Sequence, residues 1–96
     1  MSDKITPEKL AKYFSVTEKA IFKVKFAPEK KINWAAKASD FLDMAKRYFE
    51  DAKYFEKKGD VVTAFAALNY AHGWLDAGVR LGLFDVGKDD QLFVIE

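Results

Sequence analysis

Apolar side chains recur every three to four residues along three successive stretches of the chain. Such spacing places the apolar positions on one side of an α-helix. We therefore predict helices over about 7–25, 30–58 and 60–81, arranged as an all-α three-helix up-and-down bundle. The apolar stripe of the first stretch consists of Leu10, Tyr13, Phe14, Thr17, Ala20, Ile21 and Val24.

The predicted helix ends coincide with residues that start or stop helices. Thr6 and Pro7 suit an N-cap followed by the first helical position, and Pro28 separates the first two helices. Gly59 can end the second helix in the left-handed conformation, after which Asp60 can cap the third. The chain is thus predicted to form one domain over 1–96, with a loose N-terminus over 1–5 and an irregular tail over 83–96.

Small residues repeat every seven positions in both later helices. So short a connection at Gly59 and Asp60 demands an antiparallel hairpin, in which facing positions pair large residues with small ones. One such predicted pair is Phe41 with Gly78. The heptad-spaced small residues are Ala38, Ala45 and Ala52 in one helix and Ala64, Ala71 and Gly78 in the other.

A second apolar stripe on the third helix faces away from the hairpin contact. We expect this stripe to pack against the first helix or against a second subunit, so the third helix is expected to be the most buried of the three. The tail has no helical period, and docking on the bundle, pairing as a strand and a loose conformation all stay open. The stripe consists of Val61, Phe65, Leu68, Leu75 and Val79.

Composition excludes several classes of protein. The chain has no cysteine and one histidine, which excludes disulfide scaffolds and thiolate chemistry and argues against a metal site; we expect no cofactor. No apolar run approaches the roughly 18 residues that a membrane span needs. We therefore expect a cytoplasmic protein without membrane association.

The net charge of +1 conceals an uneven distribution. Residues 1–48 carry eleven basic and six acidic side chains, whereas residues 49–96 carry five and nine. Such a two-signed surface favours self-association or a charged partner over an inert bundle.

The second and third helices carry a family resemblance. It rests on the run from Arg47 to Phe55, on Gly59-Asp60, and above all on Gly-Trp-Leu-Asp-Ala-Gly at 73–78. In these residues the chain resembles a family of short archaeal proteins known only as domain of unknown function 357. The resemblance implies a compact helical bundle and no particular activity.

The same hairpin is also similar to two broader patterns. Ala52 and Phe55, followed by Gly59-Asp60 and Ala64, resemble a single tetratricopeptide unit, but a repeat array needs about three units. The hairpin is similar to HEPN domains as well, yet the arginine that precedes the histidine of their nuclease members is missing before His72.

Three sets of residues are candidates for function. A polar strip on the third helix offers a base, an orienting acid and an anion-binding side chain, as a catalytic site would. Helix-stabilising ion pairing and packing explain the same residues better. A basic face suggests single-stranded nucleic acid, since lysines lie near the aromatic side chains of Phe22 and Phe26. The strip contains Asn69, His72, Asp76 and Arg80, and the basic face contains Lys12, Lys19, Lys23, Lys30 and Lys31.

The third set is a groove of small residues on the outer face of the third helix, where another helix can approach closely. With it we group two aromatic residues that lie off the core, Phe22 and Tyr54. Our leading hypothesis is a non-enzymatic interaction or self-association module, which forms a homodimer or binds a protein partner. The candidate interface residues are Tyr70, Gly73, Ala77, Phe22 and Tyr54, with Ala66 as a further small residue of the groove.

Overall fold

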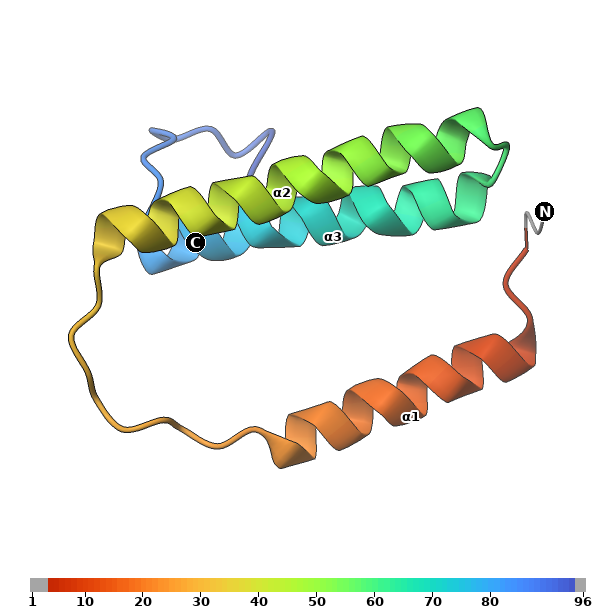
Figure 1. Ribbon diagram of the computed structural model, residues 1–96, viewed down its shortest axis with the longest axis horizontal. Helices are drawn as coiled ribbons and strands as arrows, with labels where there is room; N and C mark the ends of the chain where they lie inside the picture. Colours follow the sequence, from red (N-terminus) through yellow and green to blue (C-terminus); the bar gives the residue numbers. More distant parts are fainter. Residues whose placement is uncertain (1–3, 95–96) are drawn as a thin grey trace.

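The computed structural model describes residues 4–94 and contains three α-helices (Figure 1). They are α1 (Pro7–Lys23), α2 (Trp34–Lys57) and α3 (Val61–Leu81). Successive helices run in opposite directions, and α2 and α3 form a tight antiparallel hairpin (Figure 1). The predicted all-α fold is confirmed, and residues 4–94 contain no strand.

The helix ends follow the predicted caps, with two shifts in position. Thr6 caps α1 and Asn33 caps α2 by accepting backbone N–H bonds of 3.1 and 3.0 Å from Lys9 and Ala36. The predicted bounds 25 and 30 are therefore wrong, since α1 ends at Lys23 and α2 starts at Trp34. Between them residues 24–33, the hinge segment, have no regular secondary structure.

The hairpin core consists of the small residues that repeat every seven positions. Ala45 and Ala52 of α2 and Ala64, Ala71 and Gly78 of α3 are the buried residues of these helices. Ala45 is only 4% exposed, because small side chains let the two backbones approach closely. The heptad prediction is thus confirmed for these five residues, whereas Ala38, the sixth, is only half-buried.

The side chain nearest to Gly78 is not that of the predicted partner Phe41. Phe41 meets the indole of Trp74 edge-on, with ring centroids 4.9 Å apart. The position that a Gly78 Cβ would occupy is taken by the ring of Phe84, which follows the helix. The glycine therefore makes room for the tail.

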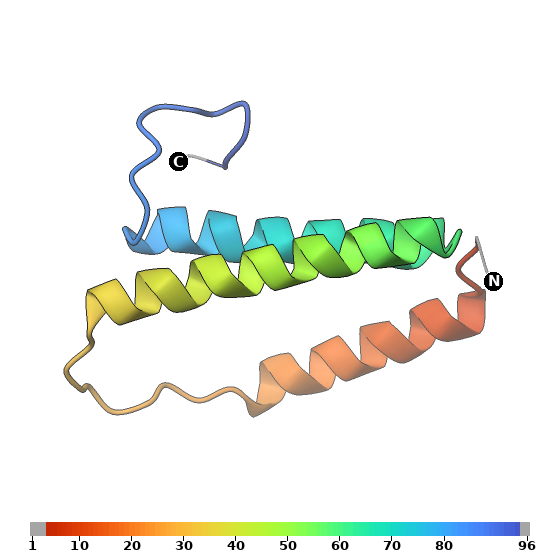
Figure 2. The same ribbon diagram turned by 45° about the horizontal axis from the view of Figure 1, so that its top comes forward.

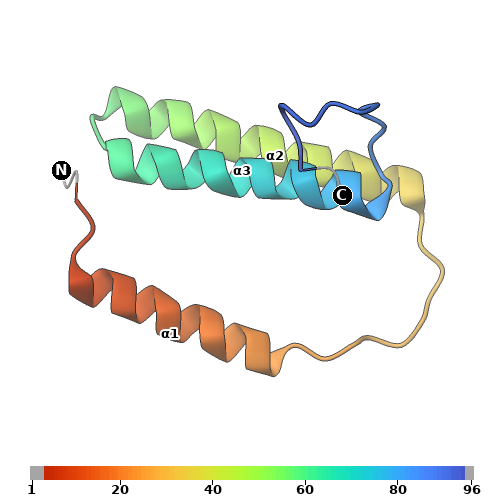
Figure 3. The same ribbon diagram turned by 180° about the vertical axis from the view of Figure 1, so that it is seen from behind.

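The first helix does not pack alongside the hairpin, contrary to the expected arrangement. α1 buries none of its residues, and no Cα of α1 lies within 8 Å of a Cα in α2 or α3. The hinge segment carries α1 away from the start of α2, and the view from behind shows the same separation (Figure 3). The second stripe of α3 is likewise left uncovered by α1, with Phe65 64% exposed.

The tail, described here over residues 83–94, docks on the hairpin. It leaves α3 at Gly82, whose φ of 85° is left-handed, and folds back over the helices (Figure 2). The tail and α1 lie on opposite sides of the hairpin in this view. Of the three conformations left open by the sequence, the structure has the docked one.

Asp60 is the N-cap of α3 and gives the hairpin a pH dependence. Its Oδ1 accepts the Thr63 N–H at 3.0 Å. Side-chain and backbone hydrogen bonds with Thr63, with the charge of Lys9 adding to them, hold the pKa of Asp60 below its ordinary value of 3.8. Because the folded pKa is the lower one, the carboxylate stabilises the fold above the unfolded pKa, and this stabilisation disappears as the pH falls through the folded pKa.

We expect Asp60→Asn to keep the cap but to weaken the acid dependence of stability, because asparagine caps well without titrating. Asp60→Ala should lower the melting temperature at neutral pH. Thermal unfolding followed by circular dichroism, at neutral pH and well below pH 3.8, measures both effects. An equal acid-induced loss in wild type and Asp60→Asn would contradict this role.

Candidate functional site

Three of the predicted interface residues line a single groove on the hairpin. Tyr70, Gly73 and Ala77 come from one face of α3, because steps of three and four residues return to the same side of a helix. The cavity has a volume of about 340 Å³. Its lining residues, hereafter the groove, are Phe41, Asn69, Tyr70, Gly73, Trp74 and Ala77.

Aromatic rings pack edge to face around this groove. Tyr70 meets Tyr48 of α2 at a centroid distance of 4.4 Å and Trp74 at 6.3 Å, with interplanar angles of 70° and 83°. Trp74 in turn meets Phe41, as described above. Such arrangements favour fixed ring positions, so the walls of the groove are held by both helices of the hairpin.

The floor of the groove is open at Gly73. A Cβ placed on this residue would meet no atom within 4 Å. Glycine within a helix costs about 1 kcal/mol relative to alanine, and among residues 4–94 no close contact at the Cβ position of Gly73 offsets that cost. Gly73 thus leaves space for something outside the hairpin.

The start of α1 lies at one end of the same side of α3. Leu10 and Tyr13 line a cavity of about 390 Å³ together with Val62, Thr63 and Ala66 of α3. Ala66, predicted to belong to the groove, lies here instead. Farther along α1 the apolar stripe is open to solvent, with Phe14 71% and Ile21 69% exposed. The stripe and the groove therefore share one side of the molecule, and no segment of residues 4–94 covers the groove or the later part of the stripe.

The other two predicted interface residues lie elsewhere. Phe22 belongs to α1, where it is 83% exposed beside Phe14. Tyr54 lies near the end of α2, packed on Phe55, with the Lys58 Nζ 5.4 Å from its ring centroid. The structure does not bring either residue to the groove.

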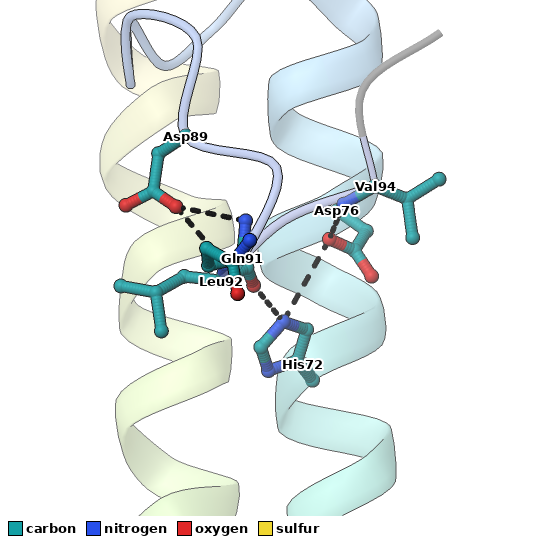
Figure 4. A network of polar contacts seen from close by, with 6 residues as sticks. All are labelled: His72, Asp76, Asp89, Gln91, Leu92 and Val94. Carbon is teal, nitrogen blue, oxygen red and sulfur yellow. Dashed lines mark hydrogen bonds and ion pairs between the residues drawn. The ribbon is translucent and has the colours of Figure 1, made fainter.

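The predicted polar strip of α3 is divided between two sides of the helix. Asn69 lines the groove, whereas His72 and Asp76 face the tail (Figure 4). His72 Nε2 donates a hydrogen bond to the Leu92 carbonyl, so this nitrogen carries the proton. Asp76 Oδ1 accepts the Val94 N–H at 3.1 Å and lies 3.8 Å from His72 Nε2. These two side chains hold the tail.

The tail is shaped for this contact by its own aspartates. Asp89 Oδ1 accepts the backbone N–H groups of Gln91 and Leu92, each at 3.0 Å, and thereby turns the chain (Figure 4). Phe93 then lies near the His72 ring, at a centroid distance of 6.1 Å. The sequence left docking open as one of three conformations but did not identify His72 and Asp76 as its contacts. The turn itself has a recognisable signal, since aspartate side chains commonly accept the backbone N–H two residues later.

The two glycines of α3 test the docked tail as a matched pair. We expect Gly73→Ala to raise the free energy of unfolding by about 1 kcal/mol, because alanine favours the helix and meets open space. Gly78→Ala should gain less or lose stability, since its Cβ would clash with the Phe84 ring and displace the tail. Urea unfolding measures stability, and amide exchange at Val94 reports tail docking. Equal gains with unchanged exchange would contradict the contact.

The five lysines of the predicted basic face are all exposed. Lys12, Lys19 and Lys23 share the side of α1 opposite its apolar stripe, and Lys30 and Lys31 follow in the hinge segment. Arg80 of the polar strip is exposed on α3. The basic face is thus spatially separate from the groove.

Comparison with known proteins identifies a family. The family model described as "Protein of unknown function (DUF357)" matches residues 12–84, and the resemblance seen in the sequence is confirmed. The match includes much of α1 as well as the whole hairpin. Curated proteins and solved structures yielded no match. Among the described residues, no helix combines the length and apolar character needed to cross a membrane.

Proposed function

We propose that this chain, which belongs to the DUF357 family of proteins of unknown function, is a non-enzymatic interaction module that binds a helix. The groove and the α1 stripe form its binding surface. One observation carries the proposal: two apolar helical surfaces lie on the same side of the molecule, and both are exposed.

The energetics of burial support this function. Fully burying one large apolar side chain contributes roughly 1.5–3 kcal/mol, and the α1 stripe contains several that are more than half exposed. Contiguous apolar surface of this kind typically marks an interaction site. A helix seated along the groove would pack against the open floor at Gly73 and the rings of Tyr70 and Trp74.

The polar chemistry of α3 is consistent with a module that is not an enzyme. His72 and Asp76, the pair that looked most like a catalytic base and its orienting acid, are both occupied by backbone groups of the tail. Their contacts support a structural role for the pair.

Two measurements together test the proposed function. Affinity capture from native lysate, with and without nuclease, compares wild-type bait with Gly73→Gln, whose side chain would fill the groove. Sedimentation of the pure chain reports self-association. We expect at least one form of association that is insensitive to nuclease and weakened by Gly73→Gln. A strict monomer at high concentration that also captures no protein would refute the module.

A second candidate function is nucleic-acid binding through the basic face. The observation in its favour is that Phe22 and Phe26 are highly exposed near lysines of α1 and the hinge segment, where bases can stack. It predicts binding of a labelled single-stranded oligonucleotide that weakens steeply with salt and with Lys19→Glu. No binding at low salt would remove this candidate.

A further inference from the structure

α1 of this same sequence carries an apolar row whose spacing matches that of the groove. We propose that two copies of the chain exchange their α1 helices, so that α1 of each copy occupies the groove of the other. The inference rests on the proposed function and names its partner as a second copy. Spacing, register, charge and the course of the hinge segment carry it.

The spacing of the two apolar rows matches. Along α1 the row advances in steps of four, three, four and three residues, and along α3 in steps of three, four, three and four. Alternating steps of three and four define the seam along which two helices pack as a coiled coil. The α1 row is Leu10, Phe14, Thr17 and Ile21, followed by Val24 as the first residue of the hinge segment, and the α3 row is Thr63, Ala66, Tyr70, Gly73 and Ala77.

The register follows from the contact that the structure already contains. Within one chain, Leu10 and Thr63 line the same cavity, and α1 runs in the same direction as α3 (Figure 1). The exchanged arrangement keeps this register between two copies. Continuing the two rows from this point places Phe14 opposite Ala66 and Ile21 opposite Gly73, with large residues against small ones. Where α3 carries the large Tyr70, the α1 row has the smaller Thr17. The two rows are thus complementary along their length.

Charge supports the same register at its first turn. Lys9 precedes Leu10, and its ammonium group contributes to the lowered pKa of Asp60 at the start of α3. Within one chain, the positive charge of Lys9 thus favours the ionised form of Asp60 at the end of the molecule where the two rows begin. The hairpin over 34–81 carries equal numbers of basic and acidic side chains, so it does not repel the lysine-rich α1.

The course of the chain favours a second copy over the chain's own α1. α1 makes no close backbone contact with its own hairpin, and the hinge segment connects its far end to the start of α2 (Figures 1 and 3). Ten hinge residues can extend over about 33–36 Å, enough for α1 to reach a neighbouring molecule. An apolar helix that buries none of its residues in its own chain, followed by an extended hinge segment, is suited to exchange between two copies.

Cross-linking tests the exchange, and the absence of native cysteine makes the test clean. Ile21→Cys and Gly73→Cys are prepared separately, with tags of different size, then refolded together and oxidised. Both positions tolerate a thiol, since Ile21 is exposed and Gly73 has open space above it. We expect a disulfide-linked product that contains one chain of each kind.

Lys19→Cys paired with Gly73→Cys is the matched control, because Lys19 lies on the opposite side of α1 and should give only background product. Absence of the mixed product, or a product no more abundant than this control, would overturn the exchange. So would a doubly substituted chain, Ile21→Cys with Gly73→Cys, that forms its disulfide within a monomer. Neither result would refute the groove as a binding site for another protein, which the capture and sedimentation measurements decide separately.

Discussion

Replacing Ala45 with leucine is expected to lower the free energy of unfolding by about 1–3 kcal/mol. Ala45 is 4% exposed between α2 and α3, so a leucine side chain must push the two helices apart or bend into the cavity of about 320 Å³ that Ala45 lines. In a domain of this size that cost is a large fraction of the total stability. Urea unfolding followed by far-ultraviolet circular dichroism measures the change.

Ala36→Leu provides the control for this prediction. Ala36 lies in the same helix and receives the same substitution, but it is exposed in the first turn of α2. Its effect should stay within about 0.5 kcal/mol. Similar losses for both variants would show that the hairpin is not held by close packing of its small residues.

Introducing glutamate at both Phe14 and Ile21 is expected to abolish self-association. In the exchanged dimer both side chains pack against the α3 row of the partner copy. Removing either from an apolar contact costs roughly 1.5–3 kcal/mol, which corresponds to about tenfold or more in the dissociation constant. Size-exclusion chromatography with light scattering, over a range of concentrations, measures the loss.

The same variants separate association from folding. Because α1 buries none of its residues in a single chain, the two glutamates should leave the helical hairpin formed. Lys12→Glu together with Lys19→Glu, on the opposite side of α1, should leave the dimer intact. Loss of association in this control instead would place the contact on the basic face.

The hairpin could be predicted from sequence because its determinants are local. Gly59 and Asp60 define the turn, and the heptad spacing of Ala45, Ala52 and Ala71 defines which sides of the helices meet. Helical periodicity also sufficed to place Tyr70, Gly73 and Ala77 together, since they lie within two turns of one helix. These predictions needed no knowledge of distant contacts.

What could not be predicted depends on contacts between distant segments. Periodicity shows that α1 has an apolar stripe, but it does not show which surface covers that stripe. Gly78 was assigned to Phe41 because a regular hairpin pairs them, whereas Phe84 of the tail competes for the same space. His72 and Asp76 looked like a catalytic pair because their tail partners, Leu92 and Val94, are backbone groups far along the chain.

Sedimentation equilibrium of the unmodified full chain tests the central claim most directly. If α1 of one copy fills the groove of another, the mass should approach twice the 10.9 kDa of the chain as concentration rises, with a single monomer–dimer equilibrium. A mass that stays at 10.9 kDa at every concentration would contradict the exchange of α1 between copies.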